Sequence, residues 1–379
     1  MAWEHIIGQD TLKAMLQQSI CSGRVPQALL LTGSRGMGSA ALAIEFARTV
    51  NCYSPLRGTT TVAACGTCQS CQQSKTLQHP NITILSALPS GKFDQTSDVK
   101  EEVLDEVREQ LALLSADPYS SYRITNANQI RIWQIRELKR SLALSTLQKG
   151  RRVVVVLDAD LMNAEAANGF LKTLEEPHPD TTIILTTAYR DKMMPTIISR
   201  CQELRLPPID EQSIIDGLLH RGECDETEAR LTASYCNGDF STALEFLHED
   251  LHEVRNDVVE MLRSALRGRD YRLGLTDSAS ILGDARDKEK ALMYLRFMAI
   301  WLRDTFSVAQ CGTTSGVINQ DLAETLQKFA TAFAGADLSR ALLAIDQACY
   351  DIKHHVSITL TISTLLIELR SILASAKTR

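Results

Sequence analysis

The sequence lacks long hydrophobic runs and a surplus of basic residues. None of its apolar runs reaches the roughly eighteen residues that a membrane-spanning helix needs, and its opening, MAWEHIIGQD, lacks the pattern of a secretory signal. The formal net charge is −6, whereas a protein that binds nucleic acid by itself usually has a basic surplus. We therefore expect a soluble, cytoplasmic protein with no membrane partner, in which any DNA contact is local or shared with other proteins.

The remaining composition is that of an ordinary globular protein. Hydrophobic residues make up 44% and charged residues 23% of 379 residues, a length that suits two or three domains. Ten cysteines without an export signal suggest reduced thiols and a metal site, since four of them cluster. We expect the scattered six to be ordinary buried thiols: Cys21, Cys201, Cys224, Cys236, Cys311 and Cys349.

The first half of the chain alternates short apolar runs with helical segments. Strands are expected at 28–31, 81–85, 153–157 and 182–187. The last two have almost no polar alternation, which is typical of buried parallel strands. Strands separated by helices imply a parallel sheet with helices on both faces. A polar segment at about 89–122, with an amphipathic stretch at 99–114, indicates an insertion to which the sequence assigns no function.

Helical periodicity replaces the strand pattern after Pro207 and Pro208. Leu342, Ile345, Cys349 and Ile352 share one helical face, and a second face comprises Leu360, Ile362, Leu365, Leu366, Leu369 and Ile372. A stretch rich in Gly, Asp and Ser at 270–287 divides this half in two. We predict an α/β domain at 1–208 and two all-α domains at 209–275 and 276–379.

The segment LLLTGSRGMGSAAL at 29–42 has the layout of a strand, a glycine-rich turn and a helix. In a P-loop, such a turn wraps phosphates with backbone N–H groups, so the candidate nucleotide-binding residues are Gly33, Gly36, Gly38 and Ser39. A working P-loop has Lys after its last glycine and then a hydroxyl residue for Mg²⁺, but this chain has Ser39 and Ala40. A plain strand-to-helix turn is the alternative. We expect no hydrolysis in either case, because phosphoryl transfer depends on positioned charge and Mg²⁺.

A second motif, VVVVLDAD at 153–160, shows a parallel loss. An ATPase would end this strand with Asp-Glu, one residue for Mg²⁺ and one to activate water. Asp158 takes the metal-binding place, but Ala159 takes the place of the activating carboxylate. The alternative, which we favour for catalysis, is that Asp158 and Asp160 only end a strand and cap the next helix. Both defects indicate a chain without its own ATPase.

Two further strings resemble signatures of the clamp-loader family of AAA+ proteins. AANGFLKTLEEP at 166–177 resembles LLKxLEEP, with Phe170 in place of the first leucine, and PTIISRC at 195–201 resembles TIxSRC. The opening residues 3–9 and the segment 130–138 resemble other parts of that family's ATPase domain. The resemblance covers about the first 208 residues well and the helical remainder in outline.

The resemblance implies an α/β AAA+ domain, then an all-α lid at 209–275 and an all-α collar at 276–379 through which subunits form an open ring. A broken P-loop in this family implies a non-hydrolysing subunit of the bacterial DNA polymerase III clamp loader, an accessory factor in sliding-clamp loading during DNA replication. The implied partners are the motor (tau/gamma) and delta subunits, with the sliding clamp and primer–template DNA as further candidates. ATP would be bound by a neighbouring subunit.

Within this family the arginine of the SRC string reaches ATP on the neighbouring subunit, which implies that Arg200 is an arginine finger. A planar guanidinium can form two hydrogen bonds to phosphate oxygens and stabilise the departing phosphoryl group. The alternative is a surface arginine paired with a carboxylate such as Glu203. We expect Ser199 and Cys201 to hold Arg200 in place. The candidate interface residues, for which a solvated face is the alternative, are Ser199, Lys172, Glu175 and Glu176.

Cys52, Cys65, Cys68 and Cys71 have the spacing C-x₁₂-C-x₂-C-x₂-C, and Gly66 gives the turn between them backbone freedom. Four sulfurs with no open position predict a structural zinc site in a module at 52–71. A redox or iron–sulfur centre and uncoordinated thiols are the alternatives, and His79 is the substitute ligand nearby. The clamp-loader resemblance extends to this cluster, since that family's ATPase domain often has a four-cysteine zinc module.

Two other functions stay open. An active ATPase motor of the tau/gamma type would need the residues that Ser39, Ala40 and Ala159 replace. A zinc-containing DNA-binding protein would need a basic face, for which the composition gives little support.

Overall fold

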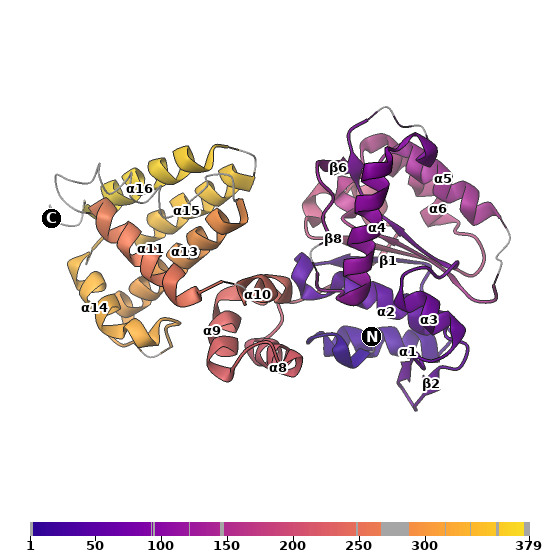
Figure 1. Ribbon diagram of the computed structural model, residues 1–379, viewed down its shortest axis with the longest axis horizontal. Coiled ribbons are helices and arrows are strands. Elements are labelled where there is room, and N and C mark those ends of the chain that lie inside the picture. The colour runs from indigo at the N-terminus through magenta and orange to yellow at the C-terminus, as the bar shows by residue number, and fades with distance from the viewer. Residues whose placement is uncertain are drawn as a thin grey trace. The chain divides into compact units, whose positions relative to one another are not determined.

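The computed structural model divides the chain into two compact units, residues 1–245 and 246–379 (Figure 1). It describes residues 3–91, 93, 95–120, 122–144, 148–247, 249–266, 288–314, 316–333, 335–353 and 356–374. The predicted boundary at 275 and the whole stretch at 270–287 lie outside the described residues, so the division of the helical half stays a prediction. Within the described ranges, no helix is long and apolar enough to cross a membrane.

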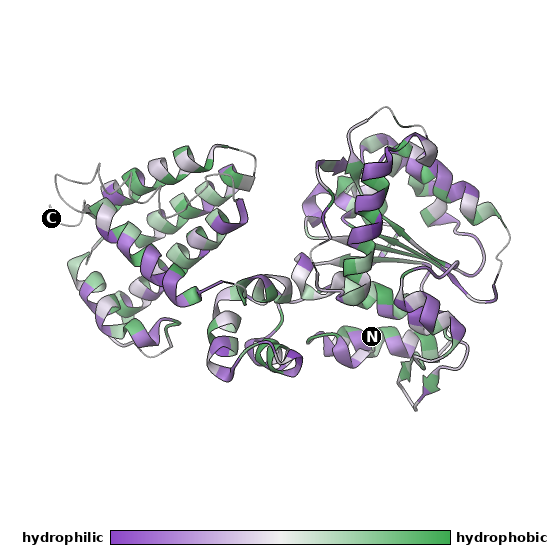
Figure 2. Ribbon diagram, in the orientation of Figure 1, coloured by the Kyte–Doolittle hydropathy of each residue, from purple (hydrophilic) through white to green (hydrophobic). Residues whose placement is uncertain are grey.

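A five-stranded parallel sheet forms the centre of the first unit. Its strands lie in the order β4 (Ile82–Leu85), β7 (Arg152–Val156), β8 (Thr181–Thr187), β1 (Ala28–Thr32) and β9 (Gln202–Arg205). The apolar strands stand out in Figure 2. The four strands predicted from the sequence are confirmed to within a residue or two. β9 was missed because it is an edge strand with only Leu204 of its residues buried, so it has no apolar run.

Helices cover both faces of this sheet, as predicted. On one face, Leu30, Val154 and Ile183 pack with residues of α5 (Ile132–Ala143) and α6 (Ala164–Glu175). Alternate strand residues such as Leu29 and Val153 are also buried and point to the opposite face, where α2 (Ser39–Asn51) contacts β7 and β8. The remaining elements of this α/β part are α1 (Asp10–Cys21), α3 (Gln69–Lys75), α4 (Glu101–Ala116) and α7 (Pro195–Ile198).

Two small hairpins accompany the main sheet. β5 (Leu88–Pro89) pairs antiparallel with β6 (Ala127–Gln129), so the polar insertion leaves and rejoins the domain at one place. The amphipathic stretch expected at 99–114 is confirmed as the helix α4 (Glu101–Ala116), which begins and ends two residues later. The second hairpin, β2 (Leu56–Arg57) with β3 (Val62–Ala63), lies between the first two clustered cysteines. The first unit ends with α8 (Glu211–Arg221), α9 (Glu226–Cys236) and the start of α10 (Phe240–Phe246).

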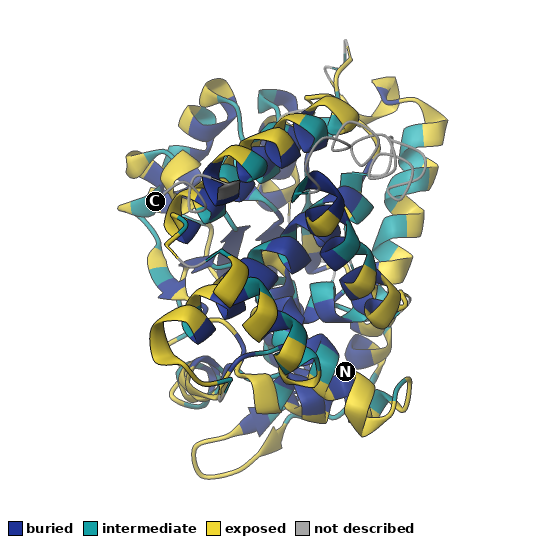
Figure 3. Cartoon of the chain, turned by 90° about the vertical axis from the view of Figure 1, so that its left-hand side faces the viewer, coloured by how far each residue is buried: buried dark blue, intermediate teal, exposed yellow. Residues whose placement is uncertain are grey.

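The described residues of the second unit form helices and no strand, as the sequence predicts. The helices are α11 (Leu251–Leu266), α13 (Lys288–Cys311), α14 (Ala323–Ala332), α15 (Leu338–Lys353) and α16 (Ile358–Ala374), with a 3₁₀ turn before α14. α15 packs against α13 and α16. Helices of this unit, which faces the viewer in Figure 3, have buried and exposed sides, drawn there in dark blue and yellow. The predicted faces are confirmed except at Leu360, which is 62% exposed because it lies about 200° around the helix from buried Ile362.

Candidate functional site

The glycine-rich turn has the predicted strand–turn–helix layout. β1 ends at Thr32, a single 3₁₀ turn spans Arg35–Met37, and α2 begins at Ser39 directly after Gly38. Gly38 has a φ of 92°, a left-handed conformation that favours glycine. The four candidate residues Gly33, Gly36, Gly38 and Ser39 are thus brought together in one loop at the carboxyl edge of the sheet.

Side chains from distant parts of the same unit cover this loop. A Cβ on Gly36 would lie 1.7 Å from Oδ1 of Asp239, and a Cβ on Gly38 would lie 3.0 Å from the Tyr119 hydroxyl. Tyr119 is 2% exposed, and its hydroxyl accepts a 2.7 Å hydrogen bond from the backbone N–H of Ile7. The Gly36 and Gly38 positions therefore pack directly against the chain's own side chains, which leave no room for a Cβ there without a shift.

The end of the insertion also joins the loop to the helices that follow the sheet. Asp117 accepts two hydrogen bonds from Arg221 of α8, at 2.7 and 3.0 Å. The ring of Tyr119 meets Phe240 of α10 edge to face at 5.0 Å, and the hydroxyl of Ser241 donates to the Tyr119 carbonyl at 2.6 Å. These contacts join residues more than 100 positions apart in the sequence, and sequence reasoning missed all of them.

Asp158, in the predicted metal-binding place, is paired with an arginine of the glycine loop. Nε and Nη2 of Arg35 donate to its two carboxylate oxygens at 3.2 and 2.9 Å. Burial raises the pKa of the Asp158 carboxyl, and Arg35 opposes that rise. The interpretation that Asp158 and Asp160 cap the next helix is wrong, because Asn163 caps α6 by accepting from Ala166 N, whereas Asp160 accepts from Thr187.

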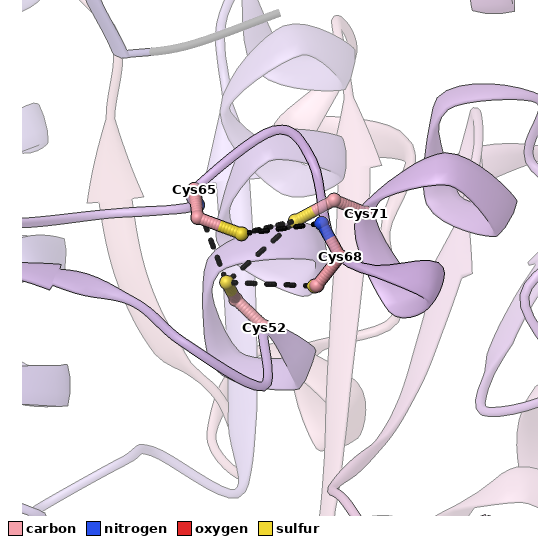
Figure 4. Close-up of side chains that lie close together, drawn as sticks. All are labelled: Cys52, Cys65, Cys68 and Cys71. Carbon is pink, nitrogen blue, oxygen red and sulfur yellow. Dashed lines mark hydrogen bonds between the residues drawn. The ribbon is translucent and has the colours of Figure 1, made fainter.

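The four clustered cysteines converge as predicted (Figure 4). Their sulfur atoms all lie within 4.8 Å of one another, with 3.6 Å between Cys52 and Cys71 and 3.9 Å between Cys65 and Cys71. Four sulfurs at about 2.3 Å from a tetrahedral zinc ion are about 3.8 Å apart, so the spacing fits zinc and is far too long for disulfides. Gly66 allows the tight turn with a φ of 76°. The long spacing after Cys52 is taken up by the β2–β3 hairpin.

The hydrogen bonds around the cluster suit thiolate ligands. Cys52 Sγ accepts from the N–H of Cys65 at 3.2 Å, and Cys65 Sγ accepts from the N–H of Cys68 at 3.4 Å. The N–H of Cys68 is the main cause that lowers the pKa of Cys65 to about 5. His79 is not a ligand: Nδ1 accepts from the N–H of Asn81, which leaves Nε2 to donate to Ser70, and burial lowers its pKa.

Arg200 follows the short helix α7 and lies at the opposite edge of the sheet from the glycine loop. The loop follows the end of β1, whereas Arg200 comes before the start of β9, which runs parallel to β1. The four residues of β9 span about 13 Å. The topology therefore separates Arg200 from the loop of its own chain by at least the length of a strand.

The carboxylate that pairs with Arg200 is Glu175, at the end of α6. Nε of Arg200 donates to Glu175 Oε1 at 2.6 Å and Nη2 donates to the same oxygen. Nη1 donates to the Thr196 carbonyl and to Ser199 Oγ, so Ser199 orients Arg200 as expected. The alternative of a surface arginine paired with a carboxylate thus holds for the pairing itself, but the partner is Glu175 and not Glu203, which binds Arg190 with two hydrogen bonds.

The other predicted residues near Arg200 divide into exposed and packed ones. Lys172 and Glu176 are exposed near the same end of α6, where they could meet a partner. Cys201 packs against the core of the sheet, as expected, and burial raises the pKa of its thiol to about 11.

Comparison with known proteins gives a consistent result. Residues 8–210 match the family model described as DNA polymerase III, delta subunit, a span that includes the glycine loop, the cysteine cluster and Arg200. The delta' subunit of DNA polymerase III from Bacillus subtilis is 25% identical over 350 residues, 92% of each chain. The delta' subunit from Escherichia coli is 26% identical over 304 residues, 80% of this chain and 76% of that protein.

Gamma-type proteins are also similar. The DNA polymerase III gamma subunit from Buchnera aphidicola (Schizaphis graminum) is 24% identical over 262 residues, 68% of this chain and 60% of that protein. Among solved structures, a gamma subunit-related protein from Thermotoga maritima has 18% identity and a TM-score of 0.43, with 96% of this chain and 99% of that chain covered.

Proposed function

The chain belongs to the DNA polymerase III delta subunit family, and from this premise we propose that it is a delta-prime-type subunit of a bacterial clamp loader. In this proposal it holds the ring together without hydrolysing ATP, and it supplies Arg200 to ATP bound by a neighbouring subunit. One observation carries the proposal: the glycine loop is covered by the chain's own Tyr119 and Asp239, whereas Arg200 lies at the other edge of the sheet.

Four features of the loop and its surroundings oppose nucleotide binding and hydrolysis. Ser39 offers no positive charge to the β- and γ-phosphates, and Ala40 has no hydroxyl for Mg²⁺. The carboxylate of Asp239 lies against Gly36, so its negative charge would oppose the binding of a phosphate at this turn. Mg²⁺ would have to displace Arg35 from Asp158 before that carboxylate could bind it.

The position of Arg200 supports action on another molecule. Since at least a strand length separates Arg200 from its own loop, it cannot stabilise charge on a nucleotide there. A guanidinium about one third exposed at the edge of the domain can reach ATP on an adjacent subunit. The relatives with delta', gamma and tau names agree with partners of the motor and delta type.

The cysteine cluster suits a structural rather than a chemical role. Its four sulfurs would complete a tetrahedral zinc site and leave no position for water or substrate. Because Cys52 follows directly on α2, whose other end forms the glycine loop, the module would fix the far end of that helix. We assign zinc here as a structural ion.

The motor function of the tau/gamma type is the second candidate. Similarity to gamma subunits favours it, but Ser39, Ala40 and Ala159 stand at the places that hydrolysis needs. A zinc-containing DNA-binding protein gains no support from a net charge of −6.

The test is the ATPase of the complex reconstituted with motor and delta subunits. We expect Arg200→Ala to lower the rate of hydrolysis at the adjacent ATP site by about 10³-fold, the usual effect of losing an arginine finger. The ATPase rate of the whole complex should then fall by the fraction that this one site contributes. Arg190→Ala is the matched control, since Arg190 is also exposed and pairs with a glutamate. An unchanged rate with Arg200→Ala, in a complex that still assembles, would remove the finger role.

A further inference from the structure

The guanidinium of Arg200 is held by oxygen atoms of its own chain on every nitrogen. Nη1 donates to the Thr196 carbonyl at 2.9 Å and to Ser199 Oγ at 3.3 Å, both within α7 or directly after it. Nε and Nη2 donate to one oxygen of Glu175, which comes from a different helix, α6. The first two contacts orient the side chain locally, and the third ties it to a second element.

Glu175 occupies the edge of the guanidinium that a phosphate would use. The parallel N–H groups on Nε and Nη2 form the pair of donors that matches carboxylate and phosphate oxygens. Arg200 cannot give these two donors to Glu175 and to a phosphate of ATP at the same time. The carboxylate and the nucleotide therefore compete for one site.

The contact is weak enough to be exchanged. The side chain of Arg200 is 32% exposed and that of Glu175 is 46% exposed, so water screens their attraction. Ion pairs with this exposure shift an equilibrium by about 1.5- to 5-fold. A triphosphate has more charge than one carboxylate and can displace Glu175, while Thr196 and Ser199 continue to orient the arginine.

We propose that Glu175 is a positioning residue that holds Arg200 on its own chain until ATP on the neighbouring subunit takes its place. The inference rests on the proposed role of Arg200 as a finger in trans. It also gives Glu175 a role that its neighbour Glu176 does not share, since the Arg200 side chain donates to Glu175 alone of the two.

Glu175→Gln in the reconstituted complex tests the inference, with ATPase rates measured over a range of ATP concentrations. The quantity compared is the ATPase rate that depends on Arg200, which is the rate of the complex minus the rate of its Arg200→Ala counterpart. For this Arg200-dependent rate, we expect the ATP concentration at half-maximal rate to fall by about 1.5- to 5-fold, because the competing charge is gone. The maximal Arg200-dependent rate should not change. Glu165→Gln is the matched control, since Glu165 lies on the same helix and forms an exposed pair with Arg136 at 3.7 Å.

The double variant Arg200→Ala with Glu175→Gln separates the two claims. If Glu175 acts through Arg200, adding Glu175→Gln to Arg200→Ala changes nothing further. Three results would overturn the inference. The ATP concentration at half-maximal rate could fall equally in the Arg200→Ala background, stay unchanged in the Glu175→Gln single variant, or rise in that variant. If Arg200→Ala itself leaves the ATPase unchanged, the proposed function fails instead.

Discussion

The two edges of the central sheet hold their polar side chains in different ways. At the carboxyl edge, the glycine loop is covered by buried Tyr119, and the Asp117–Arg221 contact ties the covering segment to α8. At the amino edge, Arg200 is partly exposed and held by one carboxylate that water can reach. Buried contacts that depend on one another open rarely, whereas a single exposed ion pair exchanges easily. We therefore expect the first edge to stay closed and the second to release its arginine.

The largest effect is expected from loss of the zinc site that the cysteine cluster predicts. Cys71→Ser should abolish zinc binding, lower the melting temperature by more than 10 °C and loosen the far end of α2, because structural zinc contributes about 10 kcal/mol or more to small modules. Metal analysis after reducing purification and thermal unfolding measure both effects. Cys236→Ser, at an equally buried cysteine outside the cluster, should keep the metal. A zinc-free wild-type protein would contradict the assignment.

The next largest loss of stability is expected from Tyr119→Ala, which removes the side chain that covers the glycine loop at the carboxyl edge. Removing a buried aromatic ring lowers the free energy of unfolding by about 3–5 kcal/mol. Tyr119→Phe should lower it by about 1–3 kcal/mol, because the Ile7 N–H loses its acceptor. Denaturant unfolding measures these values. Tyr189→Ala, at a tyrosine 48% exposed, should cost less than about 1 kcal/mol. Equal effects of Tyr119→Ala and Tyr189→Ala would show that Tyr119 does not hold the loop.

A buried carboxyl on α2 should make stability depend on pH. Burial raises the pKa of Glu45 from 4.5 to about 7, against the opposing charge of Arg48. A raised pKa means that the folded protein holds the proton more tightly, so this contribution is complete below pH 4.5 and is lost as the pH rises through 7. Relative to Glu45→Gln, the wild type should lose about 3 kcal/mol over that range.

Any loss of zinc at low pH should lower the stability of the wild type and Glu45→Gln equally, because both have the same cysteine cluster. The difference between the two proteins is therefore free of this effect. Denaturant unfolding at pH 5 and pH 8 gives the difference. A constant difference between wild type and Glu45→Gln would show that Glu45 is ionised throughout.

The smallest effect is expected at the amino edge. Glu175→Gln should change the free energy of unfolding of the isolated chain by less than about 1 kcal/mol, because its pair with Arg200 is partly exposed. Denaturant unfolding of Glu175→Gln and Tyr119→Ala under the same conditions should show a much smaller loss for Glu175→Gln. A loss of several kcal/mol would mean that the Arg200 contact is structural and not exchangeable.

Local patterns in the sequence predicted the elements and the cysteine cluster. The β-branched run of β7 and the spacing of Cys65, Cys68 and Cys71 are visible within a few residues, and the structure confirms them. β9 was missed because an edge strand such as Gln202–Arg205 needs no continuous apolar run.

The contacts that distinguish the two edges depend on the fold and could not be predicted. Tyr119 lies 112 residues from Ile7 in the sequence, and Glu175 lies 25 residues from Arg200. Glu203 is nearer in sequence to Arg200, but its carboxylate accepts hydrogen bonds from Arg190 and Thr32 instead. Sequence distance was thus a poor guide to the charged partners.

The measurement that tests the closed loop most directly is a calorimetric titration of the purified chain with ATP and Mg²⁺. We expect no saturable binding at millimolar ATP and no phosphate release, because Asp239 and Tyr119 cover the glycines and Arg35 holds the carboxylate of Asp158. Magnesium-dependent binding at micromolar ATP, or turnover by the chain alone, would contradict this account.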